Sequence, residues 1–498
     1  MTESNRILAG YEPASVLSFF EDVCAIPHVS GDEKAIADYI ETFANTRGLA
    51  CYRDSVHNVF VKLPATEGRE SAPAVMLQGH TDMVGEKTAD SAHNFATDGL
   101  KLRVDEQGWI SATDTTLGGD DGIAVAMMLA ILDNPPEPHP AIECLFTVSE
   151  ETGLEGAWAF DPTAAGATAR TMINLDSEAE GVLTAGCSGG MRTDITLPVA
   201  CEPAEGVAVR VTLDGFTGGH SGVEIHEGHT NAIKAMGRIL SALKGRYDFA
   251  LSSVNGGGKD NAIPRDCTVE LILHGQASAA EFVESVSAEA GKLRAEPNMI
   301  PADKAFTCAA EILPEAPAFE LDPTTTSAVL SILTLVRDGV LSMSAHVKGL
   351  VAHSRNLGIV KTVTDGEGKP TAVKLSMSTR SASNTHLDDS ERELATLAAA
   401  FGAEAIHRAR YPGWDYAPVS PLRDLWTSVS ERLYGITPRV EVIHAGLECG
   451  ILCDKLGEMD IVSVGPDMKD IHTPREMLSI PSVARTYRLV CETISALA

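Results

Sequence analysis

Short apolar segments separated by longer helical patterns dominate the first 180 residues of the chain. The segments AVMLQGH, AIECLFTVSE and TMINLD are apolar runs that end in polar residues, which is typical of buried strands. Between the first two lies GIAVAMMLAIL, an apolar stretch long enough for a buried helix. Helices that alternate with buried strands predict an α/β fold with a mixed, mostly parallel sheet flanked by helices.

A further helix is predicted over residues 30–48. Ile36 and Ile40 belong to a set of apolar residues at helical spacing, and a glycine at the end of the range would terminate the helix. Ser30 and Glu33 have the spacing of a capping box, which would fix its first turn.

The pattern changes in the middle of the chain. Residues 207–213 alternate between apolar and polar or small side chains, as in a strand with one exposed face. Helical patterns follow at about 232–243 and 279–295, and a similar alternation of strands and helices recurs over 304–403. Residues 190–400 are therefore predicted to form a separate α+β domain.

The α/β pattern returns near the C-terminus. Helices and strands are expected in alternation at 421–434, 438–445, 447–457, DIVSVG and 481–497. We therefore predict one domain, formed by residues 1–189 and 401–498, that is interrupted by the inserted domain at 190–400.

Composition narrows the class of protein. The 498 residues carry a formal net charge of -30, which argues against nucleic acid or an anionic membrane as the main partner. The N-terminal MTESNRILAGYEP is not a signal peptide, and the longest apolar run is about half a membrane span. The ten cysteines include no CxxC pair and are expected to be reduced thiols. These features favour a soluble, cytoplasmic protein.

The polar residues that end the first predicted strand are the first candidates for chemistry. His80 and Asp82 lie at i and i+2, so their side chains point to the same face. His80 can bind a metal ion, and Asp82 can orient a neighbouring group. Taken alone, the pair also fits two polar residues in a strand-exit turn.

Two pairs of adjacent carboxylates follow. Asp120 and Asp121 lie in a glycine-rich turn at the start of the predicted helix, where they could cap the helix or where one could bridge two cations. Glu150 and Glu151 directly follow the buried strand AIECLFTVS, where unpaired charge is costly to bury. A metal ion explains the pair if one glutamate ligates the ion and its neighbour acts as a general base toward water.

Two more polar residues complete the set. Asp176 ends TMINLD, and His472 lies in a loop before the last helix. With His80, Asp120 and one of the two glutamates they make five candidate ligands of the kind that suits zinc, while manganese and cobalt are also compatible. We therefore interpret the chain as a two-metal hydrolase.

Eight motifs resemble those of the co-catalytic di-zinc metallopeptidases. They are GHTDMV, TTLGGDDGIAVA, SEETGLEGA, INLDSE, GGHSGVEIH, NAIPR, HAGLECG and DIHTPRE. That family includes carboxypeptidase G, peptidase T, aminoacylase and the Xaa-His dipeptidases, and the resemblance is strongest to the last. It extends over essentially the whole chain, and it implies two divalent metal ions and an inserted lid domain through which the chain forms a homodimer.

The resemblance also implies roles for the five candidate ligands. His80 and Asp176 would bind one metal ion, Glu151 and His472 would bind the other, and Asp120 would bridge the two.

Further roles follow from the same resemblance. Glu150 would be the general base, and Asp82 would hold the imidazole of His80. His220 of the inserted domain would polarise the scissile carbonyl or stabilise the oxyanion. The implied substrate contacts are Asn261, Arg380, His444 and Gly446. An arginine suits a free C-terminal carboxylate, which it can bind with two hydrogen bonds.

One position departs from the dipeptidase pattern. Arg355 in AHSRNLGIV stands where a small polar residue is expected. We expect it either to alter the substrate pocket or to be exposed.

The resemblance predicts hydrolysis of unblocked dipeptides, with Xaa-His substrates such as β-alanyl-histidine included. The metal motifs alone do not separate this activity from that of a tripeptidase, a carboxypeptidase or an N-acyl amino acid amidohydrolase. A non-catalytic, metal-stabilised binding protein would be expected to lose a ligand or the base, and none is lost here. The motifs leave open whether His220 acts in cis or in trans.

Overall fold

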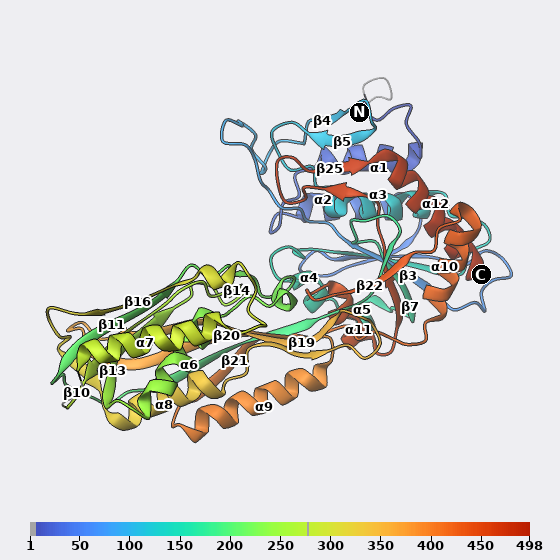
Figure 1. Cartoon of the computed structure of the whole chain (residues 1–498). Helices are drawn as coiled ribbons and strands as arrows, with labels where there is room; N and C mark the ends of the chain where they lie inside the picture. The colour runs from blue at the N-terminus through green and yellow to red at the C-terminus, as the bar shows by residue number, and fades with distance from the viewer. Residues whose placement is uncertain (1–5, 276–277) are drawn as a thin grey trace. The chain divides into compact units, whose positions relative to one another are not determined.

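The computed structural model describes residues 6–275 and 278–498, which divide into two compact units (Figure 1). The first unit is built from the chain up to Cys187, from Tyr416–Val442 and from Leu447–Ala498. The second unit is built from Ser188–Asp415 and Ile443–Gly446.

The first unit contains an eight-stranded sheet in the order β1-β2-β6-β3-β7-β23-β8-β22. Its elements up to the second unit are α1 (Ala14–Cys24), α2 (Lys34–Thr46), β1 (Ala50–Arg53), β2 (Val59–Leu63), β3 (Val75–His80), β4 (Leu102–Val104), β5 (Trp109–Ala112), α3 (Gly119–Asp133), β6 (Ile142–Thr147), α4 (Glu155–Ala159), α5 (Pro162–Ala165), β7 (Thr171–Asn174) and β8 (Val182–Cys187). Its later elements are α10 (Pro421–Tyr434), β22 (Arg439–Ile443), α11 (Glu448–Leu456), β23 (Asp460–Ser463), β24 (Met468–Lys469), β25 (Met477–Ser479) and α12 (Ile480–Ala496).

Parallel pairing in the centre of this sheet brings the site strands together. Strand β3 pairs in parallel with β6 on one side and with β7 on the other, and β7 pairs in parallel with β23. Strands β2 and β8 flank this group in antiparallel pairing. The prediction of an α/β fold with a mixed, mostly parallel sheet is confirmed.

Helix α3 is buried along nearly its whole length. Every residue from Gly119 to Leu132 is buried, and the helix packs against both α1 and β3. This burial explains why its sequence has no polar face, because a helix enclosed on all sides needs none. Strands β3 and β6 are likewise buried throughout.

The predicted capping box at the second helix is wrong. Helix α2 begins at Lys34, and the hydroxyl of Ser30 donates instead to Oδ2 of Asp82 at 2.8 Å. The carboxylate of Glu33 accepts from the backbone N–H of Gly31 and from Ser149. Both side chains therefore stabilise the loops around the strand ends and do not cap the helix.

The second unit is built on a larger antiparallel sheet, in the order β16-β11-β15-β13-β19-β20-β9-β21 with β18 paired to β19. Its elements up to α7 are β9 (Gly189–Pro198), β10 (Cys201–Pro203), β11 (Val207–Asp214), β12 (Gly219–His220), η2 (Ile225–Glu227), α6 (Ala232–Lys244), β13 (Phe249–Gly256), β14 (Ala262–Ile263), β15 (Cys267–Leu273) and α7 (Ala279–Arg294). The later ones are η3 (Asp303–Ala305), β16 (Thr307–Ile312), β17 (Phe319–Leu321), α8 (Pro323–Leu335), β18 (Gly339–Met343), β19 (Val351–Thr364), β20 (Pro370–Ser381), α9 (Asn384–Ala400) and β21 (Glu404–Tyr411).

The second unit extends beyond the predicted end of the inserted domain at residue 400. Strand β21 follows that position and pairs antiparallel with β9, so the chain stays in the second sheet until Asp415. The short segment Ile443–Gly446 also belongs to this unit. None of the helices in the described ranges has the length and hydropathy needed to cross a bilayer.

Candidate active site

The predicted ligands of the first unit meet at one edge of its sheet. His80 ends β3, Glu150 and Glu151 follow β6, and Asp176 follows β7. Because these three strands are parallel neighbours, their carboxyl ends lie at the same edge, where α/β sheets bind ligands.

Two further residues reach this edge from other elements. Asp120 lies in the first turn of α3, and His472 lies in the loop between β24 and β25. The φ of His472 is 59°, in the left-handed region that residues other than glycine rarely adopt. Such backbone conformations recur where a side chain must be aimed at a functional site.

The carboxylate of Asp120 faces a different histidine with each of its two oxygens. Its Oδ1 lies 3.1 Å from Nε2 of His80, and its Oδ2 lies 3.0 Å from Nε2 of His472. Asp176 extends the first of these groups, with Oδ1 3.6 Å from Nε2 of His80. Glu151 extends the second, with Oε1 2.7 Å from Nε2 of His472. Asp120 thus belongs to two clusters of nitrogen and oxygen donors.

The separations within the clusters, 2.7 to 3.6 Å, are those of hydrogen bonds in the metal-free chain and are also compatible with donors that share a cation. Donors about 2.0–2.1 Å from a tetrahedral zinc ion lie about 3.3 Å from one another. Oε1 of Glu151 is buried and, although it lies beside His472, has no hydrogen-bonding partner in the described part of the chain. Asp120, Glu151 and His472 each offer a ligand atom within 4.8 Å of the others. These three residues therefore fit a divalent ion, and around His80 the ligand atoms that lie within 4.8 Å of one another come from Asp121 and Asp176.

Crowding of acidic groups changes proton binding across the site. Burial, reinforced by the charge of Asp176, raises the pKa of Glu150 to about 9. Burial also raises the pKa of Asp176 to about 6. The hydrogen bond to Asp120, together with the nearby Glu151 carboxylate, raises the pKa of His472 to about 10. Without cations, the folded chain therefore takes up protons here.

The metal-free chain is expected to lose stability as pH rises from 6 to 8. Glu150, Asp176 and His472 all have pKa values above those of unfolded chains, so each stabilises the fold when protonated and loses that contribution as pH rises through its folded value. Bound cations replace the protons. The gap in Tm between zinc-loaded and chelator-treated protein should therefore widen from pH 6 to pH 8 in thermal unfolding. An equal gap at both values would contradict the assignment.

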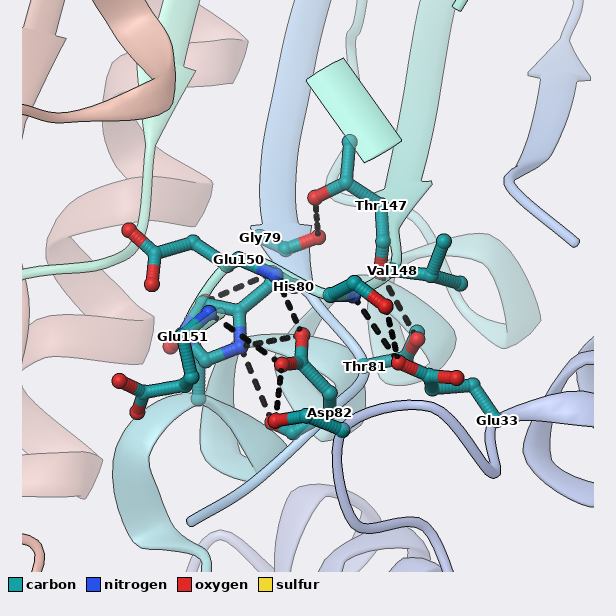
Figure 2. A network of polar contacts seen from close by, with 12 residues as sticks. Glu33, Gly79, His80, Thr81, Asp82, Thr147, Val148, Glu150 and Glu151 are labelled. Atoms are coloured by element: carbon teal, nitrogen blue, oxygen red, sulfur yellow. Dashed lines mark hydrogen bonds and ion pairs between the residues drawn. The ribbon is translucent and has the colours of Figure 1, made fainter. Parts of the chain in front are cut away.

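Two buried carboxylates that bind backbone N–H groups hold the turn carrying Glu150 and Glu151 (Figure 2). Asp82 accepts from the N–H of Glu150 at 2.9 Å and from that of Glu151 at 3.3 Å. Glu33 accepts from the N–H and the hydroxyl of Ser149, whose φ is 51°. Figure 2 shows the side chains of the two glutamates directed to the same side of the turn.

Asp82 also lies beside the histidine that it was predicted to hold. Nδ1 of His80 lies 3.0 Å from the backbone oxygen of Asp82 and 3.3 Å from its Oδ1. These contacts leave Nε2 of His80 directed toward Asp120. Asp82 therefore orients the imidazole and the glutamate turn together.

Glu476 was missed by the sequence analysis, although it ends the motif DIHTPRE. Its buried carboxylate accepts from the N–H groups of Leu117, Gly118 and Gly119 at 2.7, 3.1 and 2.8 Å. This contact joins the loop that carries Asp120 to the loop that carries His472. No spacing rule predicts a carboxylate that binds a distant loop backbone, so only the motif could have drawn attention to it.

Asp121 occupies a different position from its neighbour. Its Oδ2 accepts from the N–H of His80 at 3.1 Å, and Gly79 leaves room for it because a Cβ there would lie 2.5 Å from that oxygen. Asp121 thus anchors the end of β3, while Asp120 faces the histidines.

The other predicted site residues lie in the second unit, where several surround His220. Nδ1 of His220 accepts from the N–H groups of Gly222 and Val223 at 3.2 and 3.3 Å, so the neutral ring carries its proton on Nε2. Burial and the charge of Arg380 lower the pKa of His220, which keeps the ring neutral near pH 7. The backbone oxygen of Asn261 accepts from Ser221 at 2.9 Å, which places Asn261 on the adjoining turn.

Arg380 and His444 share this region of the second unit. Burial and the charge of Arg380 lower the pKa of His444 to about 3, and its Nε2 lies 2.7 Å from Oγ of Ser354. Arg380 donates to the hydroxyl of Tyr411 at 3.2 Å, while its buried Nε has no hydrogen-bonding partner in the residues described. Gly446 packs against the Tyr411 ring, since a Cβ there would lie 2.8 Å from it.

The alternative that Arg355 is exposed is wrong. Its side chain is 0% exposed and its guanidinium binds Glu393 at 3.1 and 3.3 Å. The same carboxylate pairs with the partly exposed Arg337, so the buried Arg355 belongs to an ion-pair network that joins β19 to α9.

Comparison with known proteins gives matches to both units. The family described as Peptidase family M28 matches residues 58–187, a range that includes His80, Asp120, Glu151 and Asp176. The family described as Peptidase dimerisation domain matches residues 211–298.

Three known proteins match nearly the whole chain. The sequence is 34% identical over 492 residues to the cytosol non-specific dipeptidase of Escherichia coli (strain K12), covering 98% of each protein. The structure of the aminoacylhistidine dipeptidase from Vibrio alginolyticus is similar with a TM-score of 0.92 and 33% identity, covering 100% of this chain and 99% of that one. A tripeptidase from Staphylococcus aureus shares the fold at a TM-score of 0.54 and 16% identity, covering 98% and 99% of the two chains.

Proposed function

The chain belongs to the metallo-dipeptidase family of the cytosol non-specific dipeptidase, and we therefore propose that it hydrolyses unblocked dipeptides, Xaa-His included, with two divalent ions. The observation that carries the proposal is the position of Asp120 between two histidines, with one oxygen 3.1 Å from His80 and the other 3.0 Å from His472. A single carboxylate with an oxygen in each of two donor clusters suits a pair of ions a few ångströms apart.

Each ion would be held by one histidine, one terminal carboxylate and the shared carboxylate. His80 and Asp176 would hold the first ion, and Glu151 and His472 the second, with Asp120 common to both. When bound, the ions would polarise the scissile carbonyl and make water easier to deprotonate. Zinc suits these donors best, and manganese or cobalt is also compatible.

Glu150 is the residue proposed to move the proton. Its carboxylate lies within 4.8 Å of donor atoms of His80 and Glu151, which belong to the two different clusters. Its backbone N–H donates to Oδ1 of Asp82, which fixes the turn from which the side chain extends. We propose that it removes a proton from the attacking water and passes it to the leaving amine.

The second unit is proposed to bind the substrate. The Nε2–H of His220 is suited to donate to the carbonyl oxygen, because its Nδ1 is occupied by two backbone N–H groups. Arg380 is proposed to bind the free C-terminal carboxylate, with Asn261, His444 and Gly446 lining the same region. The proposal does not specify whether His220 serves the active site of its own chain or that of a second copy.

Loss of the Arg380 charge is expected to lower kcat/KM specifically for substrates with a free C-terminal carboxylate. Arg380→Ala should lower kcat/KM about 10- to 100-fold for a free dipeptide, because a charged hydrogen bond is worth about 1.5–3 kcal/mol. The measurement compares the dipeptide with its C-terminal amide. The variant should show little further loss on the amide, since the carboxylate is already absent. Equal losses on both substrates would remove Arg380 from this role, and Arg408→Ala, at an exposed arginine of β21, is the control.

A substrate panel tests the proposed activity as a whole. It would contain free dipeptides with and without C-terminal histidine, one tripeptide and one N-acetyl amino acid, each with metal-stripped and metal-restored enzyme. The proposal expects metal-dependent cleavage of free dipeptides. Preference for the tripeptide or for the acylated substrate would favour the related tripeptidase or amidohydrolase activity.

A cytosolic homodimer is the proposed form of the enzyme. The match to a Peptidase dimerisation domain over residues 211–298 and the name of the Escherichia coli relative support it. Sedimentation velocity should give twice the chain mass of 52.6 kDa. A species of one chain mass at micromolar concentration would contradict the dimer.

A further inference from the structure

A layer of buried polar side chains lies beneath the ligand-bearing strand ends of the first unit. Gln78 in β3, Thr147 in β6 and Asn174 in β7 are each 0% exposed. Gln78 precedes His80 by two residues in β3, so their side chains share a face, and Asn174 is the last residue of β7, two residues before Asp176. Polar groups at such depth are costly unless they are hydrogen-bonded.

Glu448, the first residue of α11, joins this layer together. Its Oε2 accepts from Nε2 of Gln78 and from Oγ1 of Thr147, both at 2.6 Å. Oε1 of Gln78 in turn accepts from Nδ2 of Asn174 at 2.6 Å. Oδ1 of Asn174 accepts from the N–H of Asp176 at 3.3 Å. A chain of hydrogen bonds therefore runs from α11 to a proposed metal ligand.

Burial of the carboxyl group of Glu448 is energetically unfavourable. The residue is 0% exposed, and its Oε1 has no hydrogen-bonding partner in the described ranges. Burial raises its pKa to about 7. Since apolar replacement of buried ionisable groups is often neutral or stabilising, stability alone gives little reason to keep a carboxyl here.

We propose that Glu448 is a positioning residue of the metal centre, which fixes β3, β6 and β7 relative to one another and so places His80, Glu150 and Asp176. The inference rests on the function proposed above. Side chains of β3 and β6 donate directly to Oε2 of Glu448, and β7 is linked to the same atom through Gln78. Small displacements of ligands matter because metal sites require donors near their ideal separation.

Glu143 offers a matched control in the same sheet. It is a buried carboxylate in β6 that accepts from the N–H and hydroxyl of Thr168 and from the N–H of Ala169. It lies at the start of the strand, whereas Thr147 lies at the end. Its removal should lower stability without disturbing the metal centre.

The test compares Glu448→Gln, Glu448→Leu and Glu143→Leu with the parent enzyme. Cobalt affinity by chelator competition, kcat, KM and Tm are measured for each. Glu448→Gln should retain cobalt affinity and kcat within about threefold, because the amide oxygen still accepts both hydrogen bonds. Glu448→Leu should lose about 10- to 100-fold in cobalt affinity or kcat, as is usual for groups that orient metal ligands, with KM little changed. Glu143→Leu should change Tm alone.

Two results would overturn the proposal. One is a Glu448→Leu enzyme with the parent's cobalt affinity and kcat, and the other is an equal loss in Glu143→Leu. If Glu448→Leu does not fold, Thr147→Val keeps the side-chain shape and should show a smaller loss in the same direction, while parental values in that variant also reject the role. If the parent enzyme binds cobalt and cleaves dipeptides, the proposed function stands, and either of these results then counts only against the role of Glu448.

Discussion

Glu150→Gln is expected to lower kcat by about 10²- to 10⁴-fold while both metal ions remain bound, as is typical for loss of a general base. Glu150 is not needed to complete either donor cluster, because each cluster already contains a histidine, a terminal carboxylate and Asp120. Glutamine has nearly the same shape and keeps the backbone hydrogen bond to Asp82. The loss should therefore appear in turnover and not in metal content.

The measurement pairs steady-state kinetics with metal analysis of the same preparation. Glu155→Gln is the control, because this exposed glutamate lies in the first turn of the following helix, α4. It should behave like the parent enzyme. A Glu150→Gln enzyme with parental kcat would eliminate the proposed base, and one that has lost metal would make Glu150 a ligand.

Replacing Asp120 with asparagine is expected to weaken the binding of both ions at once. Asparagine keeps one oxygen but turns the other donor into an amide NH₂ group, which carries hydrogens and no negative charge. Groups that only orient ligands already contribute about 10- to 100-fold to metal affinity, so loss of a shared ligand should exceed that for both ions. Hydrolysis should fall accordingly and should not recover at ordinary zinc concentrations.

Isothermal titration of the metal-free variant with zinc would show the loss. Asp133→Asn, at the other end of α3 and paired with the partly exposed Arg47, is the control for a charge change in the same helix. If the Asp120 variant bound one ion with parental affinity, the carboxylate would belong to a single ion and the bridging arrangement would be rejected.

Much of the first unit could be predicted from periodicity because its strands and helices are either fully buried or clearly amphipathic. The helix predicted at 421–434 has those bounds in the structure, and the buried runs that end in His80, Glu150 and Asp176 are adjacent parallel strands. The predicted ligands also meet there, since strand ends bring together residues that are far apart in sequence.

The residues that hold the ligand loops could not be predicted in this way. Ser30 and Glu33 have the spacing of a helix cap, yet their side chains bind Asp82 and Ser149 in the folded chain. Glu448 binds Thr147 and Gln78, which lie 301 and 370 positions away in sequence. Side-chain contacts over such distances depend on tertiary packing and leave no local pattern.

Errors in the second unit have similar physical causes. Strand β21 is largely exposed and rich in charged residues, so its place in the sheet depends on pairing with β9 and not on burial. Arg355 is buried because Glu393, 38 residues away in sequence, pairs with it. When the sequence does not identify its partner, an arginine is expected at the protein surface.

We propose that one chain holds two ions around Asp120 and needs them for dipeptide hydrolysis. The decisive measurement is a titration of metal-free enzyme with zinc, in which calorimetry gives the number of ions bound and cleavage of a free Xaa-His dipeptide gives the activity. We predict two ions per chain, with hydrolysis restored as the sites fill. Full hydrolysis by chelator-treated enzyme, or saturation at one ion per chain with full activity, would contradict it.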